Sequence, residues 1–173
     1  MKVVFLDIDG VLTSCRIGFF NFDIYAINFL TWFFDKVGFK IVISSTWRNS
    51  HGKEFWETIF PNMIHDDWRT KRYGGEMRGF EVREWLKRHP EVTDYLIIDD
   101  DKDFFEDQIY NCLFTNPEDG FLFIHIIMLS EKYGLNAGSF DDMKEIYIHP
   151  NMMAVNGHIA KRVIAERILE AQS

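Results

Sequence analysis

The feature that most constrains the fold is an uninterrupted apolar run near the N-terminus that leads straight into two acidic residues. Val3 to Leu6 are all apolar, and Asp7, Asp9 and Gly10 follow them closely. An apolar run without alternation is typical of a strand that is buried on both faces of a parallel sheet. The glycine supplies the backbone freedom for a tight turn after the strand. We therefore expect two carboxylates at the carboxyl edge of a central strand, where open α/β sheets bind ligands.

The rest of the chain predicts an alternation of helices and short apolar strands. Apolar residues recur at helical spacing from Ile27 to Val37, Gly38 follows as a helix C-cap, and Phe39–Ser44 is a second apolar strand. The alternation continues with elements over 78–88, 95–98, 111–115 and 121–133. Strands joined by right-handed crossovers become adjacent and parallel. We expect an α/β fold, a Rossmann-like three-layer α/β/α sandwich with a central, mainly parallel sheet.

The predicted elements fit one domain that covers residues 1–173. No stretch rich in Pro, Gly or Ser suggests a linker, and nearly half of the residues are hydrophobic, which suffices for a sizeable core. Residues 46–77 are less regular and are expected to form a small insertion, and residues 135–173 a C-terminal extension that ends in a helix over 157–170. Neither connection around the site is long enough for a large cap, so we expect an open site with a minimal cap.

Charge and cysteine content limit the partners and the compartment. The net charge of −8 argues against a broad, stable nucleic-acid-binding surface but leaves room for a local basic patch. Cys15 and Cys112 form no disulfide framework, and no apolar run is long enough to cross a bilayer. We expect a cytoplasmic protein without a membrane partner, and the sequence gives no indication of its oligomeric state.

Hydroxyl side chains follow the second predicted strand, at the point where it ends. Ser44, Ser45 and Thr46 come directly after the apolar residues, and Arg48 follows them. Because the first two strands are expected to be neighbours, these hydroxyls should lie beside Asp7. Hydroxyl and backbone N–H groups at such an edge can bind phosphoryl oxygens without adding charge. The segment therefore indicates a phosphate-binding position.

A run of acidic residues follows the predicted strand Tyr95–Ile98. Asp99, Asp100 and Asp101 are consecutive, and Asp103 is close behind. Carboxylates packed this closely repel one another unless a cation neutralises them. Carboxylate oxygens are ligands that Mg²⁺ prefers. We therefore expect a Mg²⁺ site at this strand end.

Residues 66–75 combine aromatic and basic side chains and are expected to form a loop. The members of the combination are Trp68, Arg69, Lys71, Arg72 and Tyr73. Such a loop suits base stacking and phosphate steering, although an exposed loop with cation–π packing is an equally ordinary reading. Its position between two motifs favours contact with substrate. The candidate substrate-binding residues are Arg48, Trp68, Arg69 and Lys71.

Four stretches, taken in chain order, resemble the motifs of the haloacid dehalogenase-like (HAD) hydrolases, a superfamily made up mostly of phosphatases. They are DIDG, ISST, Arg78 at the start of a helix, and IIDDD. The resemblance implies that Asp7 is the nucleophile and that Asp9 is the general acid and base. It also implies that dehalogenases lack an acid at the second place, so Asp9 favours phosphate-ester chemistry.

The resemblance further implies the residues that bind the phosphate. Ser44 is the best match to the hydroxyl of the second motif, with Ser45 as the fallback. Arg78 matches the basic residue of the third motif, with Lys71 as the competing candidate. The helix start at Arg78 independently favours an anion, because the first N–H groups of a helix are free and its dipole is positive there.

The metal ligands are likewise implied by the resemblance. Mg²⁺ would be bound by Asp7, by the main-chain carbonyl of Asp9 and by the pair that follows the fourth strand. Asp100 is the preferred direct ligand and Asp99 the second choice, while Asp101 and Asp103 are expected to lie outside the ligands or in solvent.

A narrower likeness concerns the substrate. The stretches FLDIDGVL, ISSTWR, RGFEVREWL, YLIIDDD and TNPEDG look like the HAD domains of nucleic-acid repair proteins and the phosphatase half of polynucleotide kinase-phosphatases. This likeness implies a phosphatase that acts on phosphomonoesters of nucleotides or of 3′ or 5′ polynucleotide ends. The alternatives are a non-catalytic nucleotide- or partner-binding module of the same fold and a phosphotransferase.

Overall fold

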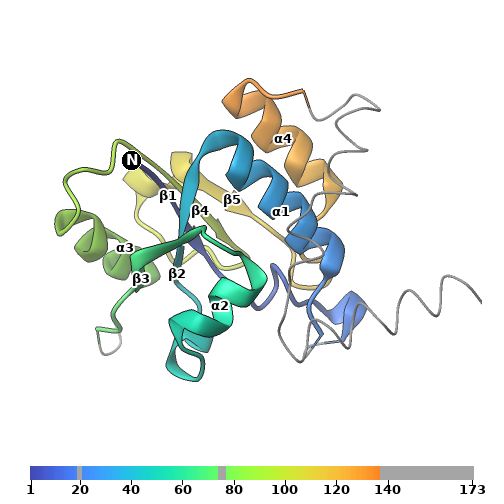
Figure 1. The fold of residues 1–173 in the computed structure, drawn as a ribbon, viewed down its shortest axis with the longest axis horizontal. Helices are drawn as coiled ribbons and strands as arrows, with labels where there is room; N and C mark the ends of the chain where they lie inside the picture. The colour runs from blue at the N-terminus through green and yellow to red at the C-terminus, as the bar shows by residue number, and fades with distance from the viewer. Residues whose placement is uncertain (19–20, 74–76, 137–173) are drawn as a thin grey trace, which may run out of the picture.

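A five-stranded parallel sheet organises the described part of the chain (Figure 1). The computed structural model describes residues 1–18, 21–73 and 77–136. The strands are β1 (Lys2–Leu6), β2 (Phe39–Ile43), β3 (Ile64–Arg69), β4 (Asp94–Asp99) and β5 (Cys112–Phe114), in the order β3-β2-β1-β4-β5. The helices are α1 (Ile24–Val37), α2 (Lys53–Ile59), α3 (Arg78–Lys87) and α4 (Phe123–Tyr133), with 3₁₀ helices η1 (Cys15–Ile17), η2 (Thr46–Asn49) and η3 (Glu106–Asn111).

Helices cover both faces of the sheet, which gives three layers (Figure 1). Helices α1, α2 and α4 pack on one face, in a core that contains Val4 and Leu6 of β1. Helix α3 packs on the other face, in a smaller core that contains Val3 and Phe5. Successive side chains of a strand point to opposite faces, so both faces of β1 are apolar and buried. The Rossmann-like three-layer fold predicted from the apolar runs is confirmed.

The register of the sheet aligns the ends of its three central strands. Leu6, the last residue of β1, pairs with Ile43 of β2 and with Ile98 of β4. Beyond this point, the main-chain N–H of Asp7 donates to the carbonyl of Ile98 at 3.0 Å, and that of Ser44 donates to the carbonyl of Leu6 at 3.0 Å. Residues that follow these three strands are therefore held side by side at one edge of the sheet.

Helix α1 ends at the predicted Gly38 cap but begins at Ile24, three residues before the predicted spacing starts at Ile27. The side chain of Asp23 accepts hydrogen bonds from the N–H groups of Tyr25 and Ala26, which would otherwise be unpaired at the helix start. Gly38 ends the helix with a φ of 79°, the left-handed conformation that glycine adopts without steric cost. The helix thus returns the chain to the amino edge of the sheet, where β2 starts beside β1.

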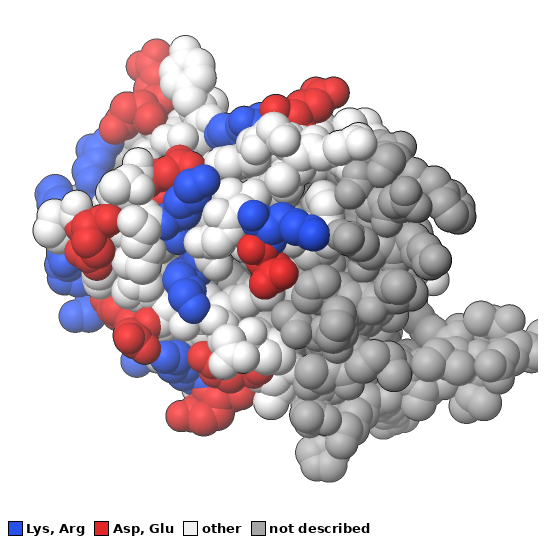
Figure 2. Space-filling model, turned by 45° about the horizontal axis from the view of Figure 1, so that its top comes forward, with Lys and Arg blue, Asp and Glu red and all other residues white. Residues whose placement is uncertain are grey.

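Charged side chains of both signs are intermixed over the described part of the face in Figure 2. The chain as a whole carries a net charge of −8. That described surface therefore has no extended basic region of the kind that binds nucleic acid broadly.

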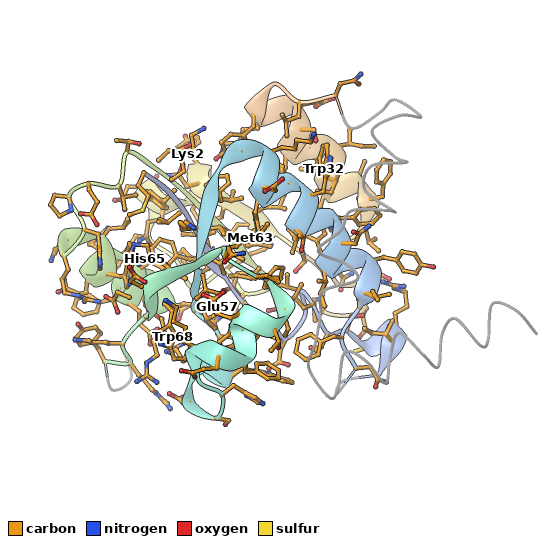
Figure 3. All side chains as sticks on the ribbon, viewed as in Figure 1. Lys2, Trp32, Glu57, Met63, His65 and Trp68 are labelled. Atoms are coloured by element: carbon orange, nitrogen blue, oxygen red, sulfur yellow. The ribbon has the colours of Figure 1, made fainter. Side chains whose placement is uncertain are left out.

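Strand β3 corrects the expectation of a loop that begins at Asp66. Residues Ile64–Arg69 form an edge strand parallel to β2, and His65 and Trp68 both project from it (Figure 3). Only Ile64 is fully buried in this strand, so its sequence lacks the apolar run that reveals a central strand. Part of the segment 46–77 that was predicted as an insertion therefore belongs to the sheet.

Two further points concern the C-terminal segment and membrane-spanning helices. The predicted helix over 157–170 and nearly all of the predicted extension 135–173 lie outside the described residues. Among the helices that the structure describes, none combines the length and the hydropathy needed to span a membrane.

Candidate active site

Three aspartates converge at the carboxyl edge of the sheet. Carboxylate oxygens of Asp7, Asp99 and Asp100 lie within 4.8 Å of one another. Asp7 follows β1 and Asp99 ends β4, and only 4% and 0% of their surfaces are exposed. The aligned ends of neighbouring strands place these carboxylates together although they are far apart in the sequence. All three are predicted metal ligands.

Arg78 reaches this carboxylate group from the start of α3. Its Nη1 lies 3.0 Å from Asp7 Oδ1 and donates to Asp99 Oδ2 at 2.6 Å. The main-chain N–H of Arg78 donates to Asp103 Oδ2 at 3.1 Å, which fixes the first turn of the helix. Of the two candidates for the basic position, the structure brings Arg78 to Asp7, whereas Lys71 pairs with no described carboxylate.

Burial and the closeness of these charged groups shift their pKa values. Burial raises the pKa of Asp7, and burial together with the charge of Asp7 raises the pKa of Asp99 to about 7. Burial and the charge of Asp7 also raise the pKa of Asp100. Burial opposes the charge of Arg78, but the carboxylates of Asp7 and Asp99 raise its pKa, so it stays a cation. One guanidinium against three carboxylates leaves an excess of negative charge in a buried site.

The donor set fits a hard divalent cation. Asp7, Asp99 and Asp100 offer oxygen ligands, which are those that Mg²⁺ prefers, and none of the three carries a soft donor. One guanidinium and one divalent cation together would balance three carboxylates, and the repulsion by Asp7 that adds to burial in raising the pKa values of Asp99 and Asp100 would be relieved. Asp9 contributes no carboxylate oxygen to this group, so its predicted contact through the main-chain carbonyl stays a prediction.

Gly10, in the turn after β1, lies directly against the Asp100 side chain. Its φ is 68°, and a Cβ at this position would lie 2.3 Å from Asp100 Oδ2. Thr115 Oγ1 donates to the Gly10 carbonyl at 2.7 Å, and the N–H of Phe121 donates to the Val11 carbonyl at 2.9 Å. The TNPEDG stretch, to which the sequence analysis gave no role, thus holds the turn against the site.

Gly10→Ala is expected to weaken Mg²⁺ binding about 10-fold or more, because the new methyl group must displace the Asp100 carboxylate. Gly38→Ala is the matched control, since Gly38 has a φ of 79° but no atom within 4 Å of the new Cβ. Both variants should lose about 1 to 2 kcal/mol of unfolding free energy through left-handed strain. Calorimetric titration with Mg²⁺ and urea denaturation test this; equal Mg²⁺ affinities in the two variants would contradict it.

The two serines after β2 have different surroundings. The hydroxyl of Ser45 donates to the Asp7 carboxylate and lowers its pKa in part. Ser44 Oγ is buried and has no hydrogen-bond partner among the described residues. Consecutive side chains at a strand end point to opposite sides, so only one of the two serines can face Asp7. Ser45 faces the Asp7 carboxylate, and which of the two serines binds phosphate stays a prediction.

Asp9 is held by two side chains that the sequence analysis did not assign. Trp47 Nε1 lies 3.0 Å from both carboxylate oxygens of Asp9, and Thr13 Oγ1 donates to Asp9 Oδ1 at 3.1 Å. The Trp47 ring is itself packed against Phe22, with the ring centroids 5.3 Å apart. The carboxylate of Asp9 is therefore fixed beside the site while the residue stays exposed. No spacing in the sequence connects Trp47 with Asp9.

Arg48, a predicted substrate ligand, is buried and makes its hydrogen bonds within the fold. It is 4% exposed, its Nη2 donates to Glu81 Oε2 at 2.7 Å, and its Nη1 donates to the Ser44 carbonyl. Thr70 Oγ1 donates to the same Glu81 oxygen at 2.9 Å. Burial lowers the pKa of Arg48, and Glu81 is the main group that opposes this shift. The guanidinium thus ties the end of β2 to α3 and has little capacity left for a ligand.

The other predicted substrate-binding residues lie along β3 and directly after it. Trp68 is partly buried and packs against the larger core, with the Arg69 guanidinium 5.0 Å from its ring centroid. Arg69 Nη1 also donates to the Arg48 carbonyl at 3.0 Å. Lys71 and Arg72 line a pocket with Arg69. The structure keeps these residues at the same sheet edge as Asp7 but does not bring them into the carboxylate group.

Comparison with known proteins places the chain in a family. Residues 3–122, more than half of the chain, match the model of the HAD domain in Swiss Army Knife RNA repair proteins. The searches of curated proteins and of solved structures gave no match. The matched range contains all four motifs, the three converging aspartates and Arg78. The chain therefore belongs to the family of HAD domains found in Swiss Army Knife RNA repair proteins, and it is a HAD-type, phosphatase-like module.

Proposed function

We propose that this protein is a Mg²⁺-dependent phosphatase that hydrolyses phosphomonoesters of nucleotides or polynucleotide ends through an aspartyl-phosphate intermediate. The observation that carries the proposal is the convergence of Asp7, Asp99 and Asp100 with Arg78 at the carboxyl edge of the sheet. The family match adds the association with RNA repair proteins. Cys15 and Cys112 are free thiols, which supports a reducing compartment such as the cytoplasm.

In the first step, Asp7 supplies the nucleophile. A carboxylate oxygen of Asp7 attacks phosphorus, the bond between phosphorus and the leaving oxygen breaks, and Asp9 gives a proton to that oxygen. The product alcohol leaves and the phosphoryl group stays on Asp7. Trp47 and Thr13 hold the Asp9 carboxylate in place for this proton transfer.

In the second step, Asp9 acts as a base. It takes a proton from a water molecule, the water oxygen attacks phosphorus, and the bond to Asp7 breaks to release inorganic phosphate. Arg78 and Ser45 lie against the Asp7 carboxylate and can donate hydrogen bonds to the phosphoryl oxygens. A bound Mg²⁺, held by Asp7, Asp99 and Asp100, would supply positive charge that lets one anion approach another.

The test is a phosphatase assay of the purified chain with Mg²⁺. The panel contains a generic aryl phosphate, mononucleotides, and oligonucleotides with a 3′ or a 5′ phosphate. We expect release of inorganic phosphate, and we expect Asp9→Asn to lower kcat about 10²- to 10⁴-fold, because the leaving oxygen loses its proton donor.

The loss in Asp9→Asn should shrink as the leaving group becomes more acidic, since a good leaving group needs less protonation. A series of aryl phosphates with graded leaving-group pKa values measures this trend. Unchanged turnover of every substrate in Asp9→Asn would refute the role of Asp9. Transfer of the phosphoryl group to an added alcohol in preference to water would show that the protein is a phosphotransferase and not a phosphatase.

A further inference from the structure

A basic pocket lies where β2 and β3 end, at the carboxyl edge of the sheet. It has a volume of about 200 Å³ and is lined by Arg48, Asn49, Arg69, Thr70, Lys71 and Arg72. Four of the lining residues are Lys or Arg, and none is acidic. The volume is roughly seven times the ~30 Å³ share of one water molecule, so a hydrated phosphate group fits.

Most of the positive charge in this pocket is uncompensated. The charge of Arg48 is neutralised by Glu81 at 2.7 Å. Arg69, Lys71 and Arg72 form no ion pair with any carboxylate in the described ranges, although acidic residues outnumber basic ones by 27 to 19 in the chain. Arg69 is also oriented, because it donates to the Arg48 carbonyl and lies over the ring of Trp68. Clustered cations without carboxylate partners favour a bound anion.

The pocket and Asp7 share one edge of the sheet. The N–H of Thr70 donates to the carbonyl of Ile43 at 3.1 Å, so the segment after β3 lies beside the end of β2, which is next to β1. Neighbouring strands are about 4.8 Å apart, which puts the end of β3 roughly 10 Å from the end of β1. Burial lowers the pKa of Arg48, which lines the pocket, and the charge of Asp7 is among those that oppose this shift, so the two groups are close enough to interact. A ligand bound at Asp7 can therefore extend into the pocket.

We propose that the basic pocket binds a phosphodiester of a single-stranded nucleic acid whose terminal phosphate lies at Asp7. The inference rests on the proposed function and narrows its substrate to strand ends, because a mononucleotide has no second phosphate to reach the pocket. Arg69, Lys71 and Arg72 supply the charge, and Asn49 and Thr70 offer uncharged polar groups. The mixture of charges on the described face in Figure 2 agrees with a local contact in place of a broad basic surface.

The first test measures binding without turnover. A short, fluorescently labelled single strand with a terminal phosphate is titrated by anisotropy with the Asp7→Asn variant, at several salt concentrations. Adding Lys71→Gln and Arg72→Gln is expected to weaken binding about 10-fold or more. Each phosphate contact in a single strand contributes about −0.7 to the slope of log K against log salt concentration. The slope should therefore become shallower by about 0.7 if one contact is lost and by about 1.4 if two are lost.

The matched control removes the same charge elsewhere. Arg83→Gln with Lys87→Gln takes two cations from the exposed side of α3, where they pair with Asp107 and Glu84. Binding in this control should change less than about 2-fold, because exposed charges far from the ligand are screened. Equal losses in the two double variants would overturn the pocket proposal, as would equally tight, pocket-dependent binding of a phosphorylated acidic peptide.

The second test separates this proposal from the proposed function. In the otherwise wild-type chain, the ratio of kcat/KM for the phosphorylated oligonucleotide to that for the generic aryl phosphate should fall at least about 10-fold in the Lys71/Arg72 double variant. An unchanged ratio in an active enzyme overturns the pocket and leaves the phosphatase intact. Specific loss of binding in a chain that hydrolyses no phosphomonoester supports the pocket and rejects the phosphatase.

Discussion

Replacing Asp7 by asparagine is expected to abolish phosphomonoester hydrolysis, with kcat lowered about 10⁴-fold or more. An amide lacks the anionic oxygen that attacks phosphorus, and the loss of a nucleophile removes a role that no neighbouring group fills. The residue is 4% exposed and its side chain contacts Arg78 and Ser45, so asparagine can keep the shape of the site. Release of inorganic phosphate from a generic aryl phosphate measures the effect.

The same variant separates lost chemistry from lost folding. Burial raises the pKa of Asp7 above its ordinary value, so the folded state disfavours the charged form. A raised carboxyl pKa lowers stability as the pH rises through the ordinary carboxyl range, and a neutral amide removes that cost at neutral pH. Urea denaturation at neutral pH should show Asp7→Asn to be at least as stable as the wild type. Retention of more than about a tenth of wild-type turnover would contradict the nucleophilic role.

Removal of divalent cations is expected to have the second largest effect. EDTA should lower kcat about 10³-fold or more, and added Mg²⁺ should restore it. The phosphate would otherwise approach three carboxylates of which two pair with Arg78 and with no other cation among the described residues. Asp100→Asn should raise the Mg²⁺ concentration for half-maximal activity about 10-fold or more. A Mg²⁺ titration of each variant after EDTA treatment and dialysis measures both effects.

Asp101→Asn provides the control for the metal site. Asp101 adjoins Asp100 in the sequence and carries the same charge, but its carboxylate is exposed and lies outside the three-carboxylate group. An exposed charge is screened by water and salt, so the Mg²⁺ requirement should change less than about 3-fold. Full activity in EDTA, or equal Mg²⁺ requirements for Asp100→Asn and Asp101→Asn, would rule out the assigned ligands.

The central part of the fold can be predicted from the sequence, because buried strands have recognisably apolar sequences. The buried parts of β1, β2 and β4 are covered on both faces and form the apolar runs 3–6, 41–43 and 96–98. Helix α1 carries both its helical spacing and its Gly38 cap. Strand β3 lies at the sheet edge and holds two consecutive aspartates, Asp66 and Asp67. Edge strands commonly carry charge, which makes them hard to distinguish from loops.

Some features of the candidate site can likewise be predicted from the sequence, and others cannot. The approach of Asp7 to Asp99 and Asp100 follows from topology alone, because the carboxyl ends of adjacent parallel strands meet at one edge. The contact of Trp47 with Asp9 and the pairing of Arg48 with Glu81 depend instead on side-chain directions across 38 and 33 residues of sequence. Periodicity holds no information on such contacts.

The choice between Ser44 and Ser45 also depends on side-chain direction, which the sequence pattern does not give. Both residues follow the same strand, and the strand end alone predicts a hydroxyl near Asp7 without saying which one. Moving one residue along an extended chain reverses the face to which a side chain points. The hydrogen bond from Ser45 to Asp7 therefore required the structure.

The central claim is that Asp7 becomes phosphorylated at a site built by acidic side chains from two strand ends. The most direct measurement is peptide mapping by mass spectrometry of Asp9→Asn, quenched in acid soon after mixing with Mg²⁺ and an aryl phosphate. The loss of the base should slow hydrolysis of the intermediate, so a phosphoryl group is expected on the peptide that contains Asp7, and only when Mg²⁺ is present. Turnover with no phosphorylated peptide, or with the phosphoryl group on another residue, would contradict the account.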